Sequence, residues 1–273
     1  MEAPKGTVRY GQINTAMIKS WLRMDAAVDS PFWAVNLMKY RAVADYADGR
    51  STTRSGRDAD DEYTPYESLA AIGAQIVFVA DVETQLLGHS PTWERIGVVK
   101  YPSRHAFIQM QSRPDFVEKH VHKDAGMEQT IVIACKPMPF PELPASAPDL
   151  ASVPHPATEE DGPVVLLHVL RFNQGEGLDH MRSYQQAAAD VAIPHGVRIS
   201  GWFSAEGTIV GDGREWDQVR FNVFPSKRAF MAVASDPARL KAQKAHRETA
   251  IADTYTMILR PRMDRLAESI KAD

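Results

Sequence analysis

"YPSRHAFIQMQSRP", residues 101–114, returns later in the chain as "FPSKRAFMAVASDP", residues 224–237. Aligned without a gap, the two stretches match proline with proline, serine with serine and phenylalanine with phenylalanine, and Pro225 follows Pro102 by 123 positions. The serine after each of these prolines is a candidate helix N-cap, and the apolar residues behind it have helical spacing. The repeated stretch therefore predicts the same strand-to-helix turn at two places in the fold.

The similarity extends well beyond this turn. Trp93 matches Trp216 at the same offset of 123 positions, whereas the openings "PFWAVNLMKY" (31–40) and "PVVLLHVLRF" (163–172) lie 132 positions apart. The first copy thus carries nine more residues between its first strand and its first helix. A period of this length indicates two duplicated domains, because solenoid repeats are much shorter.

Each copy predicts the element order β-α-β-β-α-β of a ferredoxin-like unit, an α+β fold. Apolar runs open both copies, and helices are expected around 66–72 and 180–191, each followed by a glycine. Helices cover one face of such a sheet, so pairing the two sheets buries both bare faces. In chain order we expect an N-terminal extension with a capping helix begun by Asn14, a first ferredoxin-like domain, a Pro-rich linker, a second ferredoxin-like domain and a tail, at 1–30, 31–137, 138–161, 162–265 and 266–273.

The composition is that of an ordinary globular protein and limits the classes of partner. Of the 273 residues 44% are hydrophobic and 24% are charged, and the formal net charge is −4, so a nucleic-acid partner is not expected. No apolar run approaches the roughly 20 residues that span a bilayer, and the opening residues lack the apolar core of a secretory signal. The single cysteine, Cys135, excludes an internal disulfide and favours a reducing, cytoplasmic location.

Several motifs, in the right order, connect the first copy with a known family. "NLMKYR" (36–41), "AIGAQIVFVADV" (71–82) and "WERIGVVKYPSRHAF" (93–107) resemble the DUF1330 family of the dimeric α+β barrel superfamily. The second copy keeps less of the pattern and carries His168 in place of Asn36. The resemblance implies that the two domains form a dimeric α+β barrel within one chain. It does not choose a reaction, because the superfamily includes cofactor-free monooxygenases, lactone isomerases, polyketide cyclases and haem enzymes.

Histidines near the end of the second helix are the strongest candidates for catalysis. His122 and His246 occupy matching positions, and each precedes a basic and then an acidic residue, so either can titrate near neutral pH as a general acid–base requires. An ion cluster at a helix end is the structural alternative. His120 is a further catalytic candidate, but on a helix residues two apart do not share a face, so His120 and His122 are a poor chelate and no metal is expected. Only on an extended segment would they ligate one, with Asp124 or Glu128.

Polar residues on the first strands are candidates for a pocket. Asn36 lies in an apolar run, so its amide needs a hydrogen-bond partner or a wet cavity, and we expect it to polarise a carbonyl or enolate oxygen. Lys39 faces the opposite side of the sheet and is a candidate for holding an anionic group, with solvation as the alternative. His168 stands in the place of Asn36 in the second copy. Trp93 is a candidate pocket wall, with packing as the alternative.

The polar segment 46–66 occurs only in the first copy. Long irregular segments are disordered or act as functional lids. Its arginines, Arg50, Arg54 and Arg57, can clamp a carboxylate in bidentate fashion, and a solvated loop is the alternative. Since this segment, Asn36 and both histidines near the helix end belong to the first copy, we expect that copy to carry the site.

Together these features predict a cofactor-independent enzyme with acid–base chemistry centred on His122. The substrate would be a small oxygenated or aromatic carbon compound, and the reaction an isomerisation, elimination or cyclisation. A cofactor-free monooxygenase is the first alternative, a non-catalytic binding protein the second, and haem binding a weaker one, since the chain has no haem signature. A small molecule is the expected partner, without membrane or nucleic acid, and a homodimer of this chain stays open.

Overall fold

The computed structural model describes residues 7–271, so the first six residues of the expected extension and the last two of the expected tail lie outside it. Eight strands form a closed antiparallel barrel in the order β8-β6-β3-β5-β4-β10-β7-β9, and β9 pairs back with β8. A short hairpin of β1 and β2 extends the sheet beyond β8. The strands are β1 (Thr7–Val8), β2 (Gly11–Ile13), β3 (Phe32–Tyr40), β4 (Gln75–Leu87), β5 (Arg95–Tyr101), β6 (Met127–Pro137), β7 (Val164–Phe172), β8 (Arg198–Gly211), β9 (Gln218–Phe224) and β10 (Ile251–Asp264).

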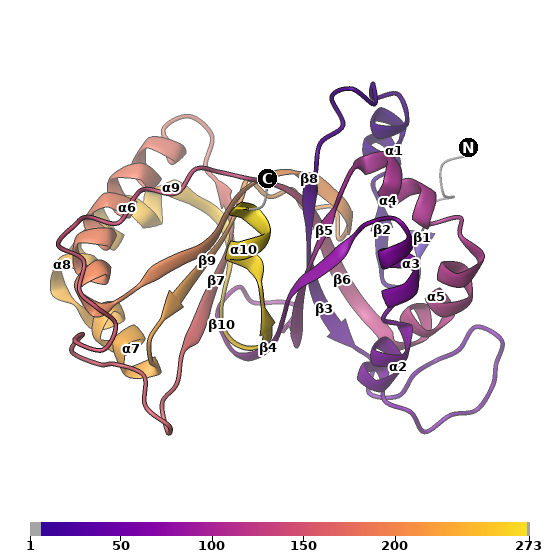
Figure 1. Cartoon of the computed structure of the whole chain (residues 1–273), viewed down its shortest axis with the longest axis horizontal. Coiled ribbons are helices and arrows are strands. Elements are labelled where there is room, and N and C mark those ends of the chain that lie inside the picture. The colour runs from indigo at the N-terminus through magenta and orange to yellow at the C-terminus, as the bar shows by residue number, and fades with distance from the viewer. Residues whose placement is uncertain (1–6, 272–273) are drawn as a thin grey trace.

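The barrel consists of two halves with the same internal order. Numbered along the chain, the strands of the first half (β3 to β6) lie side by side as 4-1-3-2, and so do those of the second half (β7 to β10). The pairs β4–β10 and β6–β8 join the halves. The helices of the two halves lie on opposite sides of the molecule, with the strands between them (Figure 1).

Helices are inserted at the same places in both halves. The first half carries α2 (Gly56–Tyr63), α3 (Tyr66–Ala71), α4 (Arg104–Met110) and α5 (Pro114–Gly126). The second half carries α6 (Gly177–Ala192), α7 (Lys227–Ser235), α8 (Pro237–Ala242) and α9 (Glu248–Ala250), with a 3-10 turn at Ile193–His195 and a π-helical turn at Gln243–Arg247. No helix within residues 7–271 has both the length and the apolar character needed to cross a bilayer.

The repeated stretch of sequence forms the turn that it predicts. Ser103 caps α4 by accepting a hydrogen bond from the Ala106 amide at 3.0 Å, and Ser226 caps α7 through the Ala229 amide at 3.0 Å. The proline that closes each stretch begins the following helix, α5 or α8. Proline suits a first helical turn because the amide it lacks has no partner there.

The barrel interior is the main hydrophobic core, and both halves contribute to it. Alternating residues of β3 such as Trp33, Val35 and Leu37 point inward and pack with Phe203 and Phe221 of the second half. The residues between them, Ala34, Asn36 and Met38, therefore point outward toward the helices. We call this side of the sheet its outer face.

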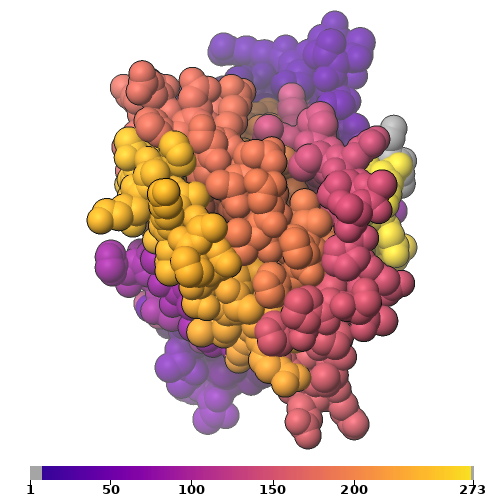
Figure 2. Space-filling view, turned by 90° about the vertical axis from the view of Figure 1, so that its left-hand side faces the viewer, coloured from indigo at the N-terminus to yellow at the C-terminus, as the bar shows by residue number. Residues whose placement is uncertain are grey.

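The segments outside the halves are more ordered than the sequence predicts. The expected tail forms α10 (Leu266–Lys271), whose Leu266 is buried in the barrel interior. Ser269 of α10 accepts a hydrogen bond from the Trp33 indole at 2.9 Å. The Pro-rich linker has no helix or strand but is fastened to α7, because Asp161 accepts the Lys227 amide at 2.7 Å. Figure 2 shows the linker, in rose, along the helices of the second half.

The N-terminal extension and the polar segment 46–66 differ in how well they match expectation. The capping helix α1 (Thr15–Leu22) begins as predicted, with Asn14 accepting the Met17 amide at 3.0 Å. The irregular segment, however, contains α2, which packs on α5. The sequence of α2, "GRDADDEY", offers no apolar stripe, and its helix is stabilised by tertiary contacts that no local pattern reveals.

Candidate functional site

A cavity of about 380 Å³ lies in the first half, between the outer face of the sheet and the helices that cover it. Strand alternation brings Asn36 to it from β3 and Gly97 from β5. Its walls are largely apolar and aromatic, and polar side chains reach it from α5, from α2 and from the strands β3, β5 and β10. The lining residues include Tyr10, Asn36, Tyr63, Phe116, His120 and Lys123.

One face of α5 supplies two polar groups of the cavity, an imidazole and an ammonium. Phe116, His120 and Lys123 are spaced four and three residues apart, so they share a face of the helix, and all three line the cavity. His122 lies on another side of α5 and does not line the cavity. Its Nδ1 atom instead lies 2.7 Å from the hydroxyl oxygen of Tyr46. The helix therefore brings His120, and not His122, to the candidate site.

The imidazole of His120 is neutral at physiological pH. Its Nε2 atom lies 2.8 Å from the hydroxyl oxygen of Tyr10, and its ring packs against Phe116 at 5.5 Å between centroids. Burial, reinforced by the charge of Lys123 and opposed by that of Asp124, lowers the pKa of His120 to about 4. Burial also raises the pKa of the Tyr10 hydroxyl, so Tyr10 keeps its proton.

Lys123 presents an ammonium group without a carboxylate partner. Within residues 7–271, no acidic side chain lies within the 4.0 Å of an ion pair. The ammonium lies over the rings of Tyr63 and Tyr10, at 5.1 Å and 5.7 Å from their centroids. Burial lowers the pKa of Lys123, with Asp60 opposing. A cation held by two rings alone is available to an anionic or partly negative oxygen of a bound molecule.

Asn36 lines the cavity, but its geometry changes the role expected of it. Its side-chain nitrogen donates to the backbone carbonyls of Ala34 at 3.0 Å and Gly97 at 3.4 Å. Both N–H groups are therefore engaged by the sheet, while the amide oxygen has no partner among the described residues. Asn36 is thus oriented to accept a hydrogen bond from a ligand rather than to stabilise an oxyanion.

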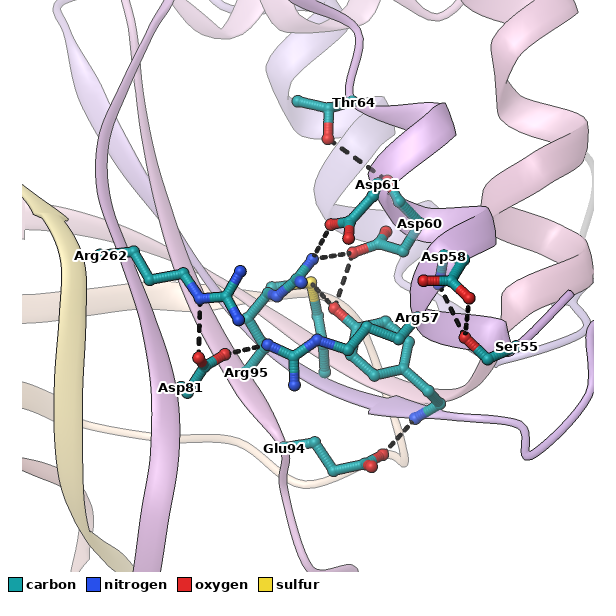
Figure 3. Close-up of polar contacts among 12 residues, drawn as sticks. Ser55, Arg57, Asp58, Asp60, Asp61, Thr64, Asp81, Glu94, Arg95 and Arg262 are labelled. Carbon is teal, nitrogen blue, oxygen red and sulfur yellow. Dashed lines mark hydrogen bonds and ion pairs between the residues drawn. The ribbon is translucent and has the colours of Figure 1, made fainter.

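A buried network of charges fastens α2 to the sheet and forms part of the cavity wall (Figure 3). Arg95 of β5 forms ion pairs with Asp60 at 3.2 Å and Asp61 at 2.7 Å, and the Tyr40 hydroxyl donates to Asp60 at 2.7 Å. Arg95 and Asp60 are each only 5% exposed. Since each buried charge has a counter-charge, this network is structural, and it holds α2 so that Tyr63 reaches the cavity.

The arginines of segment 46–66 are paired and do not line the cavity. Arg57 forms an ion pair with Asp81, which Arg262 also contacts at 2.7 Å (Figure 3). Burial opposes this pairing, but the two arginines hold the pKa of Asp81 below its ordinary value. Arg50 pairs with Asp48 at 2.9 Å and lies over the Tyr46 ring. The structure does not bring these arginines together as a clamp.

The other predicted residues also lie away from the cavity. Lys39 forms an ion pair with Glu128 at 2.9 Å. Trp93 is buried in the barrel interior, with its ring 5.6 Å from that of Tyr255, which is the packing alternative. In the second half, His168 lies 3.2 Å from the Thr256 hydroxyl, and His246 lies 3.4 Å from His180. The first half therefore supplies Asn36 and His120 of the predicted set.

Sequence reasoning missed Lys123, Tyr10 and Tyr63. The helical spacing of Phe116, His120 and Lys123 was the available signal for Lys123, because it extends the stripe that faces the sheet. Tyr10 and Tyr63 arrive from the β1–β2 hairpin and from the end of α2, and no local pattern relates either element to α5. Within residues 7–271, no three side chains of His, Cys, Asp or Glu form a group suited to a metal ion.

No family model and no curated protein matches the chain, so the resemblance to the DUF1330 family stays a prediction. Among solved structures, the chain is similar to a protein of unknown function from Rhodopseudomonas palustris, with 23% identity and a TM-score of 0.42, over 48% of this chain and 98% of the other. It is similar to a chlorite dismutase variant from Candidatus Nitrospira defluvii, with 11% identity and a TM-score of 0.48, over 93% and 98%. It is also similar to a candidate monooxygenase from Lactobacillus acidophilus, with 10% identity and a TM-score of 0.44, over 87% and 97%.

Proposed function

We propose that the chain is a cofactor-independent enzyme that moves a proton on a small carbonyl compound bound in the first-half cavity. The observation that carries this proposal is the pair of His120 and Lys123 on one face of α5, a neutral imidazole beside an unpaired ammonium. The aromatic walls suit a substrate with an apolar or aromatic body. Isomerisation, elimination and cyclisation all begin with such a proton transfer.

Four polar side chains of the cavity each have one role in the proposed reaction. His120 takes a proton from the carbon beside the substrate carbonyl, and Lys123 stabilises the negative charge that develops on the carbonyl oxygen. The enolate in turn favours the protonated imidazole, because an opposite charge nearby raises the pKa of a histidine. Tyr10 holds the His120 ring in place through the 2.8 Å contact, and Asn36 accepts a hydrogen bond from a substrate hydroxyl or amine.

Exchange of substrate protons for deuterium tests this reaction directly. The chain would be incubated in D₂O with a panel of small aliphatic and aromatic ketones and keto acids, and loss of the C–H signal would be followed by NMR. We expect exchange by the wild type and a loss of at least about 100-fold in His120→Gln, the size of a general-base contribution. His122→Gln is the matched control, since it removes a histidine two residues away that does not line the cavity.

Equal exchange rates for wild type and His120→Gln would overturn the proposal. Binding of a panel compound without any exchange or turnover would favour a non-catalytic binding protein instead.

A cofactor-free monooxygenase is the second candidate function. The aromatic wall formed by Tyr101, Phe107 and Phe116 favours a flat phenolic substrate, which His120 would deprotonate before it meets O₂. Oxygen consumption that accompanies turnover, measured with an electrode, separates this reaction from proton transfer alone.

We also propose that the two halves are ferredoxin-like domains produced by duplication, with boundaries at 31–137 and 162–265. The shared 4-1-3-2 strand order and the two matching serine caps support this proposal. The reducing, cytoplasmic location stays a prediction. Further association into a homodimer stays a prediction, which light scattering of the purified chain would check.

A further inference from the structure

The second half gathers three arginines around one histidine. Arg220 of β9 lies directly opposite His168 of β7 in the strand register. Arg239 of α8 reaches the Tyr184 hydroxyl of α6 at 3.5 Å, and the charges of Arg239 and of Arg247 in the π-helical turn act on the same histidine. Burial, followed by the charges of Arg247, Arg220 and Arg239, holds the pKa of His168 well below its ordinary value. The three guanidinium groups thus act on one half-buried point between the sheet and the helices.

No carboxylate forms an ion pair with these arginines within residues 7–271. Arg220 donates to the Asn222 amide oxygen at 3.0 Å and lies over the Trp202 ring at 5.1 Å. Arg239 donates to Gln243 at 2.7 Å and to the Tyr184 hydroxyl at 3.5 Å, and its buried Nε atom has no partner. Among the described residues Arg247 forms no ion pair, and burial lowers its pKa although the charge of the exposed Glu248 beside it opposes the shift. The contacts of the cluster are neutral groups, which do not cancel its charge.

Such a cluster is unfavourable unless something else supplies negative charge. Buried ionised groups are normally paired, because an unpaired charge loses the solvation of water. Burial lowers the pKa of Arg220 to about 10, so at neutral pH the guanidinium is still charged. The paired Arg95 of the first half shows how the same fold neutralises a buried arginine, with two aspartates. The second half has no counterpart to them.

The cluster occupies the place in the second half that corresponds to the cavity of the first half. Arg220 follows Gly97 by the repeat offset of 123 positions, and Arg247 follows Lys123 by 124. Gly97 and Lys123 both line the first-half cavity. The glycine leaves space over the sheet in the first half, whereas an arginine enters the same space in the second.

We propose that the second half binds a small oxyanion, the carboxylate or phosphate group of a small molecule, between the outer face of the sheet and α8. Arg220, Arg239 and Arg247 donate to its oxygens, and planar guanidinium groups suit bidentate contacts with either group. Tyr184, Gln243 and Asn222 orient the arginines through the hydrogen bonds described above. This site is independent of the reaction proposed for the first half.

Titration of the full chain with inorganic phosphate and with malonate tests the site and distinguishes a phosphate ligand from a carboxylate ligand. Binding is followed by calorimetry in a buffer of low ionic strength without other oxyanions, and by the fluorescence of Trp202 under Arg220. We expect saturable binding of at least one probe, weakened about tenfold or more in Arg220→Gln and in Arg247→Gln. Binding of phosphate alone assigns a phosphate group, and binding of malonate alone assigns a carboxylate.

Arg182→Gln is the matched control, because Arg182 is an exposed arginine of α6 that pairs with Asp179 at 3.0 Å. An equal loss of binding in this control would mean that net charge alone explains the effect, and this would overturn the proposal. The absence of binding by both probes would overturn it as well.

Thermal unfolding of Arg220→Met distinguishes a loss of anion binding from a loss of folding. If the arginine cluster is unpaired without a bound anion, Arg220→Met should unfold at a higher temperature than the wild type in anion-free buffer, because the substitution removes a buried, unpaired charge. The same variant must lose the rise in Tm that the bound probe gives the wild type. A lower Tm for Arg220→Met in both buffers would show a structural arginine and end the proposal.

Discussion

His120 and His122 differ only in the side of α5 that they occupy, and this decides which of them meets the cavity. The sequence showed that they do not share a face, and the repeated position of His122 made it the first candidate, whereas His120 is the one that lines the cavity. The match between His122 and His246 identifies a position that both halves share, and a shared position need not belong to a cavity described in one half. The cavity residues of the first half are mostly those in which the halves differ, such as Gly97 and Asn36.

The pKa of His120 predicts a pH dependence of stability. In the unfolded chain a histidine binds protons below about pH 6.5, whereas His120 in the folded chain does so only below about pH 4. Between these values the unfolded state binds more protons, so the free energy of unfolding falls as the pH is lowered through this window. His120→Phe removes this contribution. Urea unfolding at pH 7 and pH 5 should show a smaller loss in the variant than in the wild type, and an identical loss would contradict the buried, neutral imidazole.

Lys123 and Arg95 both line the cavity but should respond differently to loss of charge. Lys123→Met breaks no ion pair, so the free energy of unfolding should stay within about 1 kcal/mol of the wild type, the scale of a cation–π contact. Arg95→Met leaves Asp60 buried without its partner and should cost about 3–5 kcal/mol. Denaturant unfolding of both variants measures the difference. A comparable loss in the two would mean that Lys123 is a structural cation.

At the scale of elements, the pairing of α2 with α5 shapes the cavity. Gly56 and Gly126 bring the two helices so close that a Cβ atom at Gly126 would overlap the carbonyl oxygen of Gly56. Gly126→Ala should therefore destabilise the chain by about 1–3 kcal/mol and displace Tyr63 from Lys123. Gly162→Ala is the control, because its new Cβ has ample room. Chemical denaturation of both variants checks the expectation, which fails if they are equally stable.

The same comparison shows what local sequence can and cannot reveal. The serine caps and the Asn14 cap were predictable because each depends on a few adjacent residues. The helix α2 was not, since Asp60 looks like a solvated loop residue until Arg95, 35 positions away, is placed beside it. The tail likewise became α10 because the open end of the barrel offers Leu266 a buried site. The residues that line the cavity, such as Tyr10 and Lys123, are far apart in the sequence and are brought together only by tertiary contacts of this kind.

At the scale of the whole molecule, α10 closes the barrel and should contribute to its stability. Leu266 is fully buried among interior residues of both halves. Leu266→Ala should lower the free energy of unfolding by about 2–5 kcal/mol, the range for a leucine deleted from a core. Leu240→Ala, at an exposed leucine of α8, should change it little. Equilibrium unfolding in urea measures both variants. A loss in Leu266→Ala as small as that in Leu240→Ala would show that α10 is dispensable for stability.

The shared interior has a consequence for synthesis on the ribosome. A first half that folds once residue 137 has emerged is an open half-barrel: its inner face still lacks Phe203 and Phe221, and its edge strands β4 and β6 each have a neighbour on one side only. The strands that pair with those edges, β8 and β10, emerge only after residue 198. During that interval the nascent chain exposes two unpaired strand edges and an apolar surface, the features that invite association between chains. Slow translation of the linker would lengthen this exposure, and fast translation would shorten it.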